Sequence, residues 1–264
     1  MIISVGGDQP DTYNVSYDIG WMLDAVTTKD LHALVIDFAP RKRALLAKYL
    51  TRDLAVPRNQ VTHLRGPDAT HITGALQSLE KNTDIRRGSS IIIYISWPSD
   101  EPSTPTRIGN PTTGLEYSTF FSLVQQISAQ KGENVTVILD TNPPPMDTNA
   151  EATSNQQPHV LLTACLPKQY AQYDVNGGVF TQALIRSMKT CNAEELERLT
   201  WDRIVDKSAD ALATQKGIRP QIPECTGTFK NRAIFNGIFG GKVNRPQKER
   251  ENCLISISVK PSST

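Results

Sequence analysis

Residues 90–95, Ser-Ile-Ile-Ile-Tyr-Ile, decide the fold class of this sequence. A short run of β-branched and aromatic residues of this kind is typical of a strand buried on both faces. A helix is predicted next along the chain, with its apolar residues at helical spacing: Phe120, Leu123, Val124 and Ile127. Gly132 supplies a stop for this helix, and Asn134–Asp140 returns as a second strand. A strand, a helix and another strand in this order predict neighbouring parallel strands.

The same alternation extends in both directions from this stretch. Further strands are predicted at 32–37, 60–65 and 159–164. Amphipathic helices are predicted at 41–55, in the segment that begins after the N-cap residue Asp68, around 180–188 and around 201–212. Strands separated by helices indicate a mainly parallel sheet of about six strands covered on both faces, which is a three-layer α/β/α sandwich.

Two long loops interrupt the pattern, at 97–117 and 141–158, and both are rich in Pro, Thr and Ser. The second begins Thr-Asn-Pro-Pro-Pro, which cannot continue a paired strand because three successive prolines lack N–H donors. Ligands of open α/β sheets bind beyond the carboxyl ends of the strands, so these loops are expected to frame the site.

Composition excludes several classes of function. The chain of 264 residues carries 28 Lys and Arg against 27 Asp and Glu, which gives no global field to attract nucleic acid or anionic membrane. No apolar stretch approaches the length of a transmembrane helix, and the N-terminus lacks the features of a secretory signal. Four widely spaced cysteines favour a reducing, cytoplasmic compartment. We expect no cofactor, and no Cys/His cluster suggests a metal site.

The residues at the two strand ends are poor candidates for catalysis. Ser96-Trp97-Pro98 follows one strand and Asp140-Thr141-Asn142 the other, and neither end supplies a histidine or a thiol. Cys165 follows the strand 159–164 and could act as a substitute nucleophile. His159 lies at the opposite end of that strand, however, so the two cannot form a dyad.

Several separate motifs together resemble a known family. The strings HALVID (32–37), SIIIYIS (90–96), VTVILD (135–140), HVLLTAC (159–165), GGVFTQALI (177–185) and PQIPECTGTFKNRAIFN (220–236) are similar to the caspase-type domain of metacaspase-like fungal proteins. They occur in the order that the family has, over roughly residues 31–236. The resemblance implies a caspase-like (caspase–hemoglobinase) fold for 31–236, with extensions at 1–30 and 237–264.

The resemblance also implies that the catalytic dyad has been lost. In the family the strand similar to SIIIYIS ends in Gly-His-Gly, and here Trp97 and Pro98 stand at the first glycine and the histidine. The strand similar to VTVILD leads into the nucleophilic cysteine, and Asn142 stands at that position. Asp140 matches the aspartate beside the nucleophile, which in metacaspases helps to receive a basic side chain. A purely structural role for Asp140, accepting backbone hydrogen bonds at the end of its strand, is the alternative.

These observations predict a catalytically inactive pseudo-peptidase that acts by binding a protein or peptide, such as an active caspase-like relative, with Asp140 as the binding residue. Two alternatives remain open. One is an active cysteine-type endopeptidase with an unrecognised nucleophile, and the other is a self-associating structural or defence protein. Two runs rich in β-branched residues, Met1–Val5 and Cys253–Val259, are expected to pair with each other, and a homodimer built on such edges is the alternative.

Overall fold

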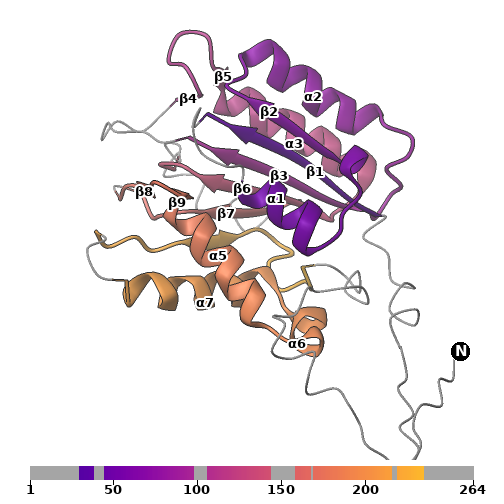
Figure 1. Ribbon diagram of the computed structural model, residues 1–264. Coiled ribbons are helices and arrows are strands. Elements are labelled where there is room, and N and C mark those ends of the chain that lie inside the picture. Colours follow the sequence, from indigo (N-terminus) through magenta and orange to yellow (C-terminus); the bar gives the residue numbers. More distant parts are fainter. Residues whose placement is uncertain are drawn as a thin grey trace, which may run out of the picture.

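In the computed structural model, a six-stranded sheet forms the centre of the molecule, with strand order β10-β7-β6-β3-β1-β2 (Figure 1). The structure describes residues 30–38, 45–97, 106–143, 158–167, 169–215 and 219–234. The strands are β1 (Leu31–Asp37), β2 (Val61–Arg65), β3 (Ser90–Ser96), β6 (Val135–Asp140), β7 (Val160–Thr163) and β10 (Glu224–Thr226). All pair in parallel except β10, which is antiparallel to β7.

Helices cover both faces of this sheet (Figure 1). One face carries α2 (Ala69–Lys81) and α3 (Tyr117–Lys131), and the other carries α1 (Leu45–Lys48), α5 (Val179–Thr190) and α7 (Trp201–Ala213), with α6 (Ala193–Arg198) between the last two. The fold class is therefore confirmed as a three-layer α/β/α sandwich with a mostly parallel sheet of six strands.

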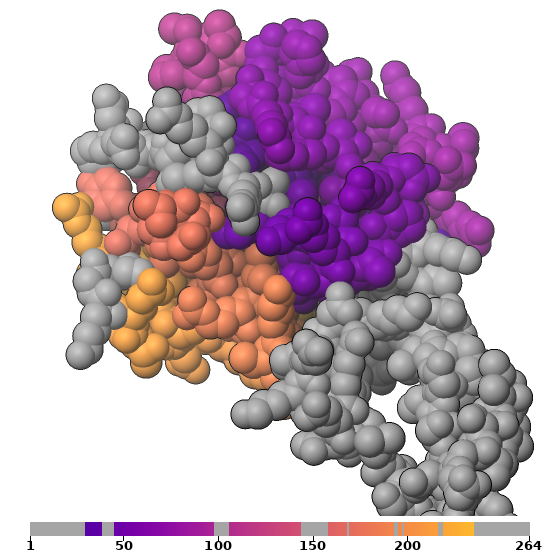
Figure 2. All heavy atoms as spheres, in the orientation of Figure 1, coloured from indigo at the N-terminus to yellow at the C-terminus, as the bar shows by residue number. Residues whose placement is uncertain are grey.

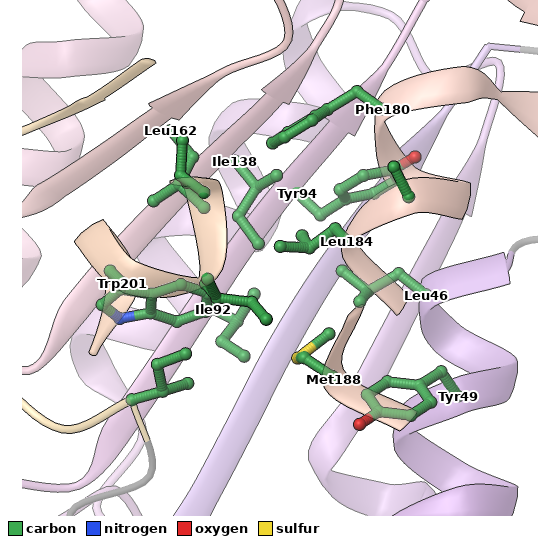
Figure 3. Close-up of a cluster of buried hydrophobic side chains, with 14 of the residues drawn as sticks. Leu46, Tyr49, Ile92, Tyr94, Ile138, Leu162, Phe180, Leu184, Met188 and Trp201 are labelled. Atoms are coloured by element: carbon green, nitrogen blue, oxygen red, sulfur yellow. The ribbon is translucent and has the colours of Figure 1, made fainter. Parts of the chain in front are cut away.

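Alternation of side chains along the strands divides the core into two clusters. Ile91, Ile93 and Ile95 of β3 pack toward α2 and α3, whereas Ile92 and Tyr94 pack toward α5. Figure 3 shows the second cluster, in which strand residues meet Leu46, Tyr49, Phe180, Leu184, Met188 and Trp201 from the helices. Both faces of β3 are buried, which is why its sequence is apolar without interruption.

Predicted helix boundaries agree closely with the structure where local signals were strong. Asp68 caps α2 by accepting a hydrogen bond from the backbone N–H of His71 at 2.9 Å. Gly132 ends α3 with φ of 96°, a left-handed conformation that favours glycine. The structure departs from the α-helix predicted at 41–55 in the second half of that segment. After α1 the chain continues as a π-helical turn, η3 (Tyr49–Asp53), closed by the hydrogen bond from Leu54 N to Tyr49 O.

The structure contains several short elements that the sequence interpretation did not include. The segment 97–117 contains a small hairpin of β4 (Arg107–Ile108) and β5 (Leu115–Glu116), rather than a loop throughout. A second hairpin, β8 (Tyr173–Asp174) and β9 (Gly177–Gly178), precedes α5. One turn of 3₁₀-helix, η4 (Arg58–Gln60), leads into β2. The strands predicted within 1–5 and 253–259 lie outside the described residues, as do Pro98 and the proposed domain boundary between residues 236 and 237.

Candidate functional site

The carboxyl ends of four parallel strands meet at one edge of the sheet. The register pairs Asp37 with Arg65, Asp37 with Ser96, and Ser96 with Asp140, so these four residues end β1, β2, β3 and β6 side by side. The backbone continues this alignment beyond the strands, because Trp97 N donates to Asp140 O at 3.2 Å. The two strand ends singled out in the sequence are thus brought together at the edge where ligands of such sheets bind.

Asp140 lies at the centre of a buried polar network at this edge. Its side chain is fully buried, and Oδ2 accepts hydrogen bonds from Thr181 N at 3.3 Å, from the Thr181 hydroxyl, and from the Tyr94 hydroxyl at 3.4 Å. The Tyr94 and Thr181 hydroxyls are 2.9 Å apart. The Tyr173 hydroxyl donates to the backbone oxygen of Asp140. Strand β6 is in this way tied to β3, to the β8–β9 hairpin and to α5.

The carboxylate of Asp140 caps helix α5 from a distant strand. Thr181 is the third residue of α5, and its N–H is one of those that a helix leaves unpaired at its first turn. Gly178 is the N-cap of α5 and offers no capping side chain. A Cβ at position 178 would overlap the Asp140 carboxyl group, so glycine here permits the close approach. The negative charge also lies at the positive end of the helix dipole.

Burial sets the protonation of this carboxyl group. It raises the pKa of Asp140 to about 6, and the negative charge of Asp37 acts in the same direction. The hydrogen bonds from Thr181 and Tyr94 oppose the shift. Oδ1 has no hydrogen-bond partner within the described part of the chain. The geometry therefore gives Asp140 the structural role described above, and its role in binding a basic side chain stays a prediction.

Asn142 is built into the protein interior. Its side chain is 4% exposed, and Oδ1 accepts a hydrogen bond from Ala171 N at 2.9 Å. This bond fastens the segment after β6 to the segment before β8. Thr141, which lies between Asp140 and Asn142, is fully buried. Trp97, which follows β3, lies beside Phe38, which follows β1, with ring centroids 6.3 Å apart.

Cys165, His159 and His71 occupy separate positions in the core or on the surface. Cys165 is fully buried, and burial raises the pKa of its thiol to about 12. His159 is fully buried at the opposite end of β7 and stacks on Phe121 at 5.9 Å between centroids. His71 is exposed on α2 and pairs with Asp68 at 2.7 Å. Within the described ranges, no group of three His, Cys, Asp or Glu residues could hold a metal ion.

Sequence reasoning selected Asp140 and Asn142 but missed their partners. Thr181 is 41 residues from Asp140 and belongs to an otherwise ordinary amphipathic helix. One signal was present: Tyr94 places a hydroxyl within a strand buried on both faces, and such a group needs a buried partner. No periodicity indicates which residue that partner is.

Comparison with solved structures gives the class of fold. The chain is similar to the crystal structure of caspase-1 from Spodoptera frugiperda, with a TM-score of 0.54, 11% identity, and coverage of 92% of this chain and 98% of that chain. It is also similar to a structural-genomics target from Geobacter sulfurreducens, with a TM-score of 0.51, 14% identity, and coverage of 77% and 98%. The chain therefore has a caspase-like α/β fold.

Sequence comparison adds no closer relationship. No model of a protein family matches this chain, and no curated protein matches it. None of the helices in the described ranges combines the length and apolar character needed to cross a membrane.

Proposed function

We propose that this protein is a catalytically inactive member of the caspase-fold proteins that acts by binding a protein or peptide. The observation that carries the proposal is the state of Asn142, which stands where the family resemblance implies the nucleophile. Its carboxamide is buried and hydrogen-bonded to Ala171 N. A carboxamide is not among the side chains that form covalent acyl intermediates. The resemblance places Pro98, which has no basic nitrogen, where the general base would be.

The alternative, a cysteine peptidase with another nucleophile, would need an accessible and ionisable thiol. Cys165 follows the carboxyl end of β7, which is the strand next to β6, so it is the cysteine to consider first at this edge. It is fully buried, and burial raises the pKa of its thiol to about 12, so the thiol is protonated near pH 7. Cys225 is in the edge strand β10, and burial raises its pKa to about 12 as well. Cys191 is buried at the end of α5, where its thiol donates to Ser187 O.

Peptidase activity is tested with the full chain under reducing conditions. Fluorogenic peptides ending in Arg, Lys or Asp are the substrates, and the Cys165→Ser variant is the matched control. We expect no turnover above that of Cys165→Ser. Thiol-dependent turnover that disappears in Cys165→Ser and persists in Cys191→Ser would replace the proposal with the peptidase alternative.

Binding is tested separately with an arginine-containing peptide. If Asp140 retains the role implied by the resemblance, Asp140→Asn weakens binding more than tenfold, because charge-assisted pairs are the strong ones. Asp174→Asn is the control, since Asp174 is a second carboxylate near this edge that accepts from Gln182 Nε2 at 2.8 Å. Equal affinities for wild type and Asp140→Asn would assign Asp140 to the structural role alone.

A further inference from the structure

A groove lined by basic side chains runs between edge strand β2 and the α1–η3 segment. Its volume is about 710 Å³, and it is lined by Ala47, Lys48, Thr51, Arg52, Arg58, Val61, His63 and Arg65. The α1–η3 segment, in dark purple, lies on the face turned to the viewer in Figure 2. Arg65 at the end of β2 belongs both to this groove and to the row of strand ends described above, whereas the ends of β3 and β6 do not line the groove.

The fold aligns these basic residues by two simple periodicities. Val61 packs against the core cluster that α1 and α5 cover, so His63 and Arg65, two and four residues further along β2, lie on the same face. Lys48 and Arg52 are four residues apart on the opposing helical segment. Arg58, in η4, stands where the chain enters β2. Lys48, Arg52, Arg58 and Arg65 are all exposed.

The groove concentrates positive charge in a chain that is almost neutral overall. Four lining residues are lysine or arginine and none is a carboxylate, whereas the whole chain has a formal net charge of +1. The nearest acidic residue along η3, Asp53, is paired with Lys189 of α5 at 2.6 Å. His63 contributes a buried Nε2 atom with no hydrogen-bond partner in the described part of the chain. Such an arrangement attracts anionic groups.

The groove also lies beside an open edge of the sheet. In the described region β2 pairs only with β1, so its outer backbone groups have no neighbouring strand. Two copies of this edge would repel each other through their positive charges, which disfavours self-pairing. An extended peptide with acidic side chains meets both requirements, because it offers backbone hydrogen bonds to β2 and carboxylates to the arginines.

We propose that this groove binds an acidic peptide segment in extended conformation, which adds to the sheet along β2 and places its carboxylates against Arg58, Arg65 and Lys48. The inference rests on the binding part of the proposed function and gives it a second site. That site is three strands from β6, or roughly 14 Å from Asp140. Single-stranded nucleic acid is the less suitable ligand, because its bases stack on aromatic rings and the only ring among the lining residues is the imidazole of His63.

The proposal is tested by fluorescence anisotropy with the full chain and a labelled ten-residue peptide of alternating Glu and Val. A peptide of alternating Gln and Val is the uncharged control. Arg58→Glu combined with Arg65→Glu reverses the charge of the groove, and Arg86→Glu combined with Arg87→Glu makes the same change of net charge in an exposed turn elsewhere. We expect the groove variant to bind the acidic peptide at least tenfold more weakly than wild type, and the turn variant to bind within about twofold of wild type.

Hydrogen exchange tests the mode of binding in the same samples. Strand addition predicts that amides of β2 become protected when the acidic peptide is bound, and that the groove variant loses this protection. Absence of binding by wild type, equal loss in both double variants, or tighter binding of a ten-nucleotide oligouridine than of the acidic peptide would each overturn the proposal. None of these results depends on whether peptides are cleaved, so the groove and the loss of catalysis fail or stand separately.

Discussion

The Asp140 carboxylate accepts hydrogen bonds from both the backbone N–H and the hydroxyl of Thr181, which stands in the first turn of α5. This contact joins the end of β6 to a helix that begins 39 residues later in the sequence. It also explains the glycine at the N-cap of α5, because Gly178 leaves the space that the carboxyl group fills. Asp140 thus replaces the capping side chain that α5 lacks.

The first prediction concerns the Thr181 hydroxyl. Thr181→Val keeps the shape of the side chain and removes one donor to a buried carboxylate, so the free energy of unfolding should fall by about 2 kcal/mol. Thr181→Ser keeps the donor and should cost less than about 1 kcal/mol. Urea unfolding of both variants near pH 7 gives the comparison. A larger loss for serine than for valine would mean that packing of the methyl group, and not the hydrogen bond, matters at this position.

The second prediction uses the raised pKa of Asp140. A folded-state pKa of about 6, above the ordinary 3.8, means that the native state binds more protons than the unfolded state between those two values. Asp140 therefore costs stability at pH 7, and that cost is relieved as the pH falls from above 6 to below 4, by up to roughly 3 kcal/mol. Asp140→Asn lacks this titration. The stability of Asp140→Asn relative to wild type should be lower at pH 4 than at pH 7, as measured by urea unfolding at both values.

Other titrating groups are common to wild type and variant, so the difference between the two chains isolates Asp140. A difference for Asp140→Asn that is independent of pH would show that the carboxyl group is not titrating between 4 and 6.

The third prediction concerns His159, whose titration changes stability with pH in the direction opposite to that of Asp140. Burial lowers its pKa from 6.5 to about 4, so the unfolded state binds more protons between these values. Stability is lost as the pH falls through this window, by up to roughly 3 kcal/mol. His159→Phe keeps the stacking on Phe121 and removes the titrating group. Thermal or urea unfolding should show that the stability of the variant relative to wild type increases as the pH falls from 7 to 4, whatever its stability at pH 7.

If His159→Phe and wild type keep a constant difference between pH 7 and 4, the imidazole of His159 gains access to a proton without unfolding, and the assignment is wrong.

The sequence predicted the parts of the fold that depend on local pattern. The buried strands were evident because both faces of β3 and β6 are apolar, and the ends of α2 and α3 were marked by Asp68 and Gly132. The β4–β5 hairpin could not be predicted from the sequence, because each strand has two residues and the pairing depends on contacts such as that of Arg107 with Glu116 at 2.6 Å. Strand β10 has three residues preceded by Pro223, which is too short for a period to be read.

The candidate site was predicted only at its strand ends. Asp140 and Asn142 were found because parallel strands bring their carboxyl ends to one edge. What those side chains do depends on Thr181 and Ala171, which are 41 and 29 residues away along the chain. Capping of one element by a side chain from another is a tertiary contact, and hydrophobic periodicity carries no information about it. The burial of Asp140 likewise follows from the packing of α5 and the β8–β9 hairpin over the edge.

The last prediction concerns Asn142, where the sequence departs from the pattern of active relatives that the resemblance implies. Asn142→Ala removes the acceptor for Ala171 N and leaves a buried N–H unpaired, so the free energy of unfolding should fall by about 1–3 kcal/mol. Asn142→Asp retains an acceptor at the same place and should preserve the hydrogen bond. Amide exchange at Ala171, followed together with urea unfolding, separates a local effect from a global one: the alanine variant should accelerate exchange there and the aspartate variant should not.

Asn142→Cys should behave like alanine in both measurements and remain inactive on the peptides ending in Arg, Lys or Asp, because the resemblance places Pro98 where a base would have to activate the thiol. Unchanged exchange at Ala171 in the alanine variant would show that the asparagine does not hold this segment, and turnover by the cysteine variant would show that the rest of a catalytic site is still present.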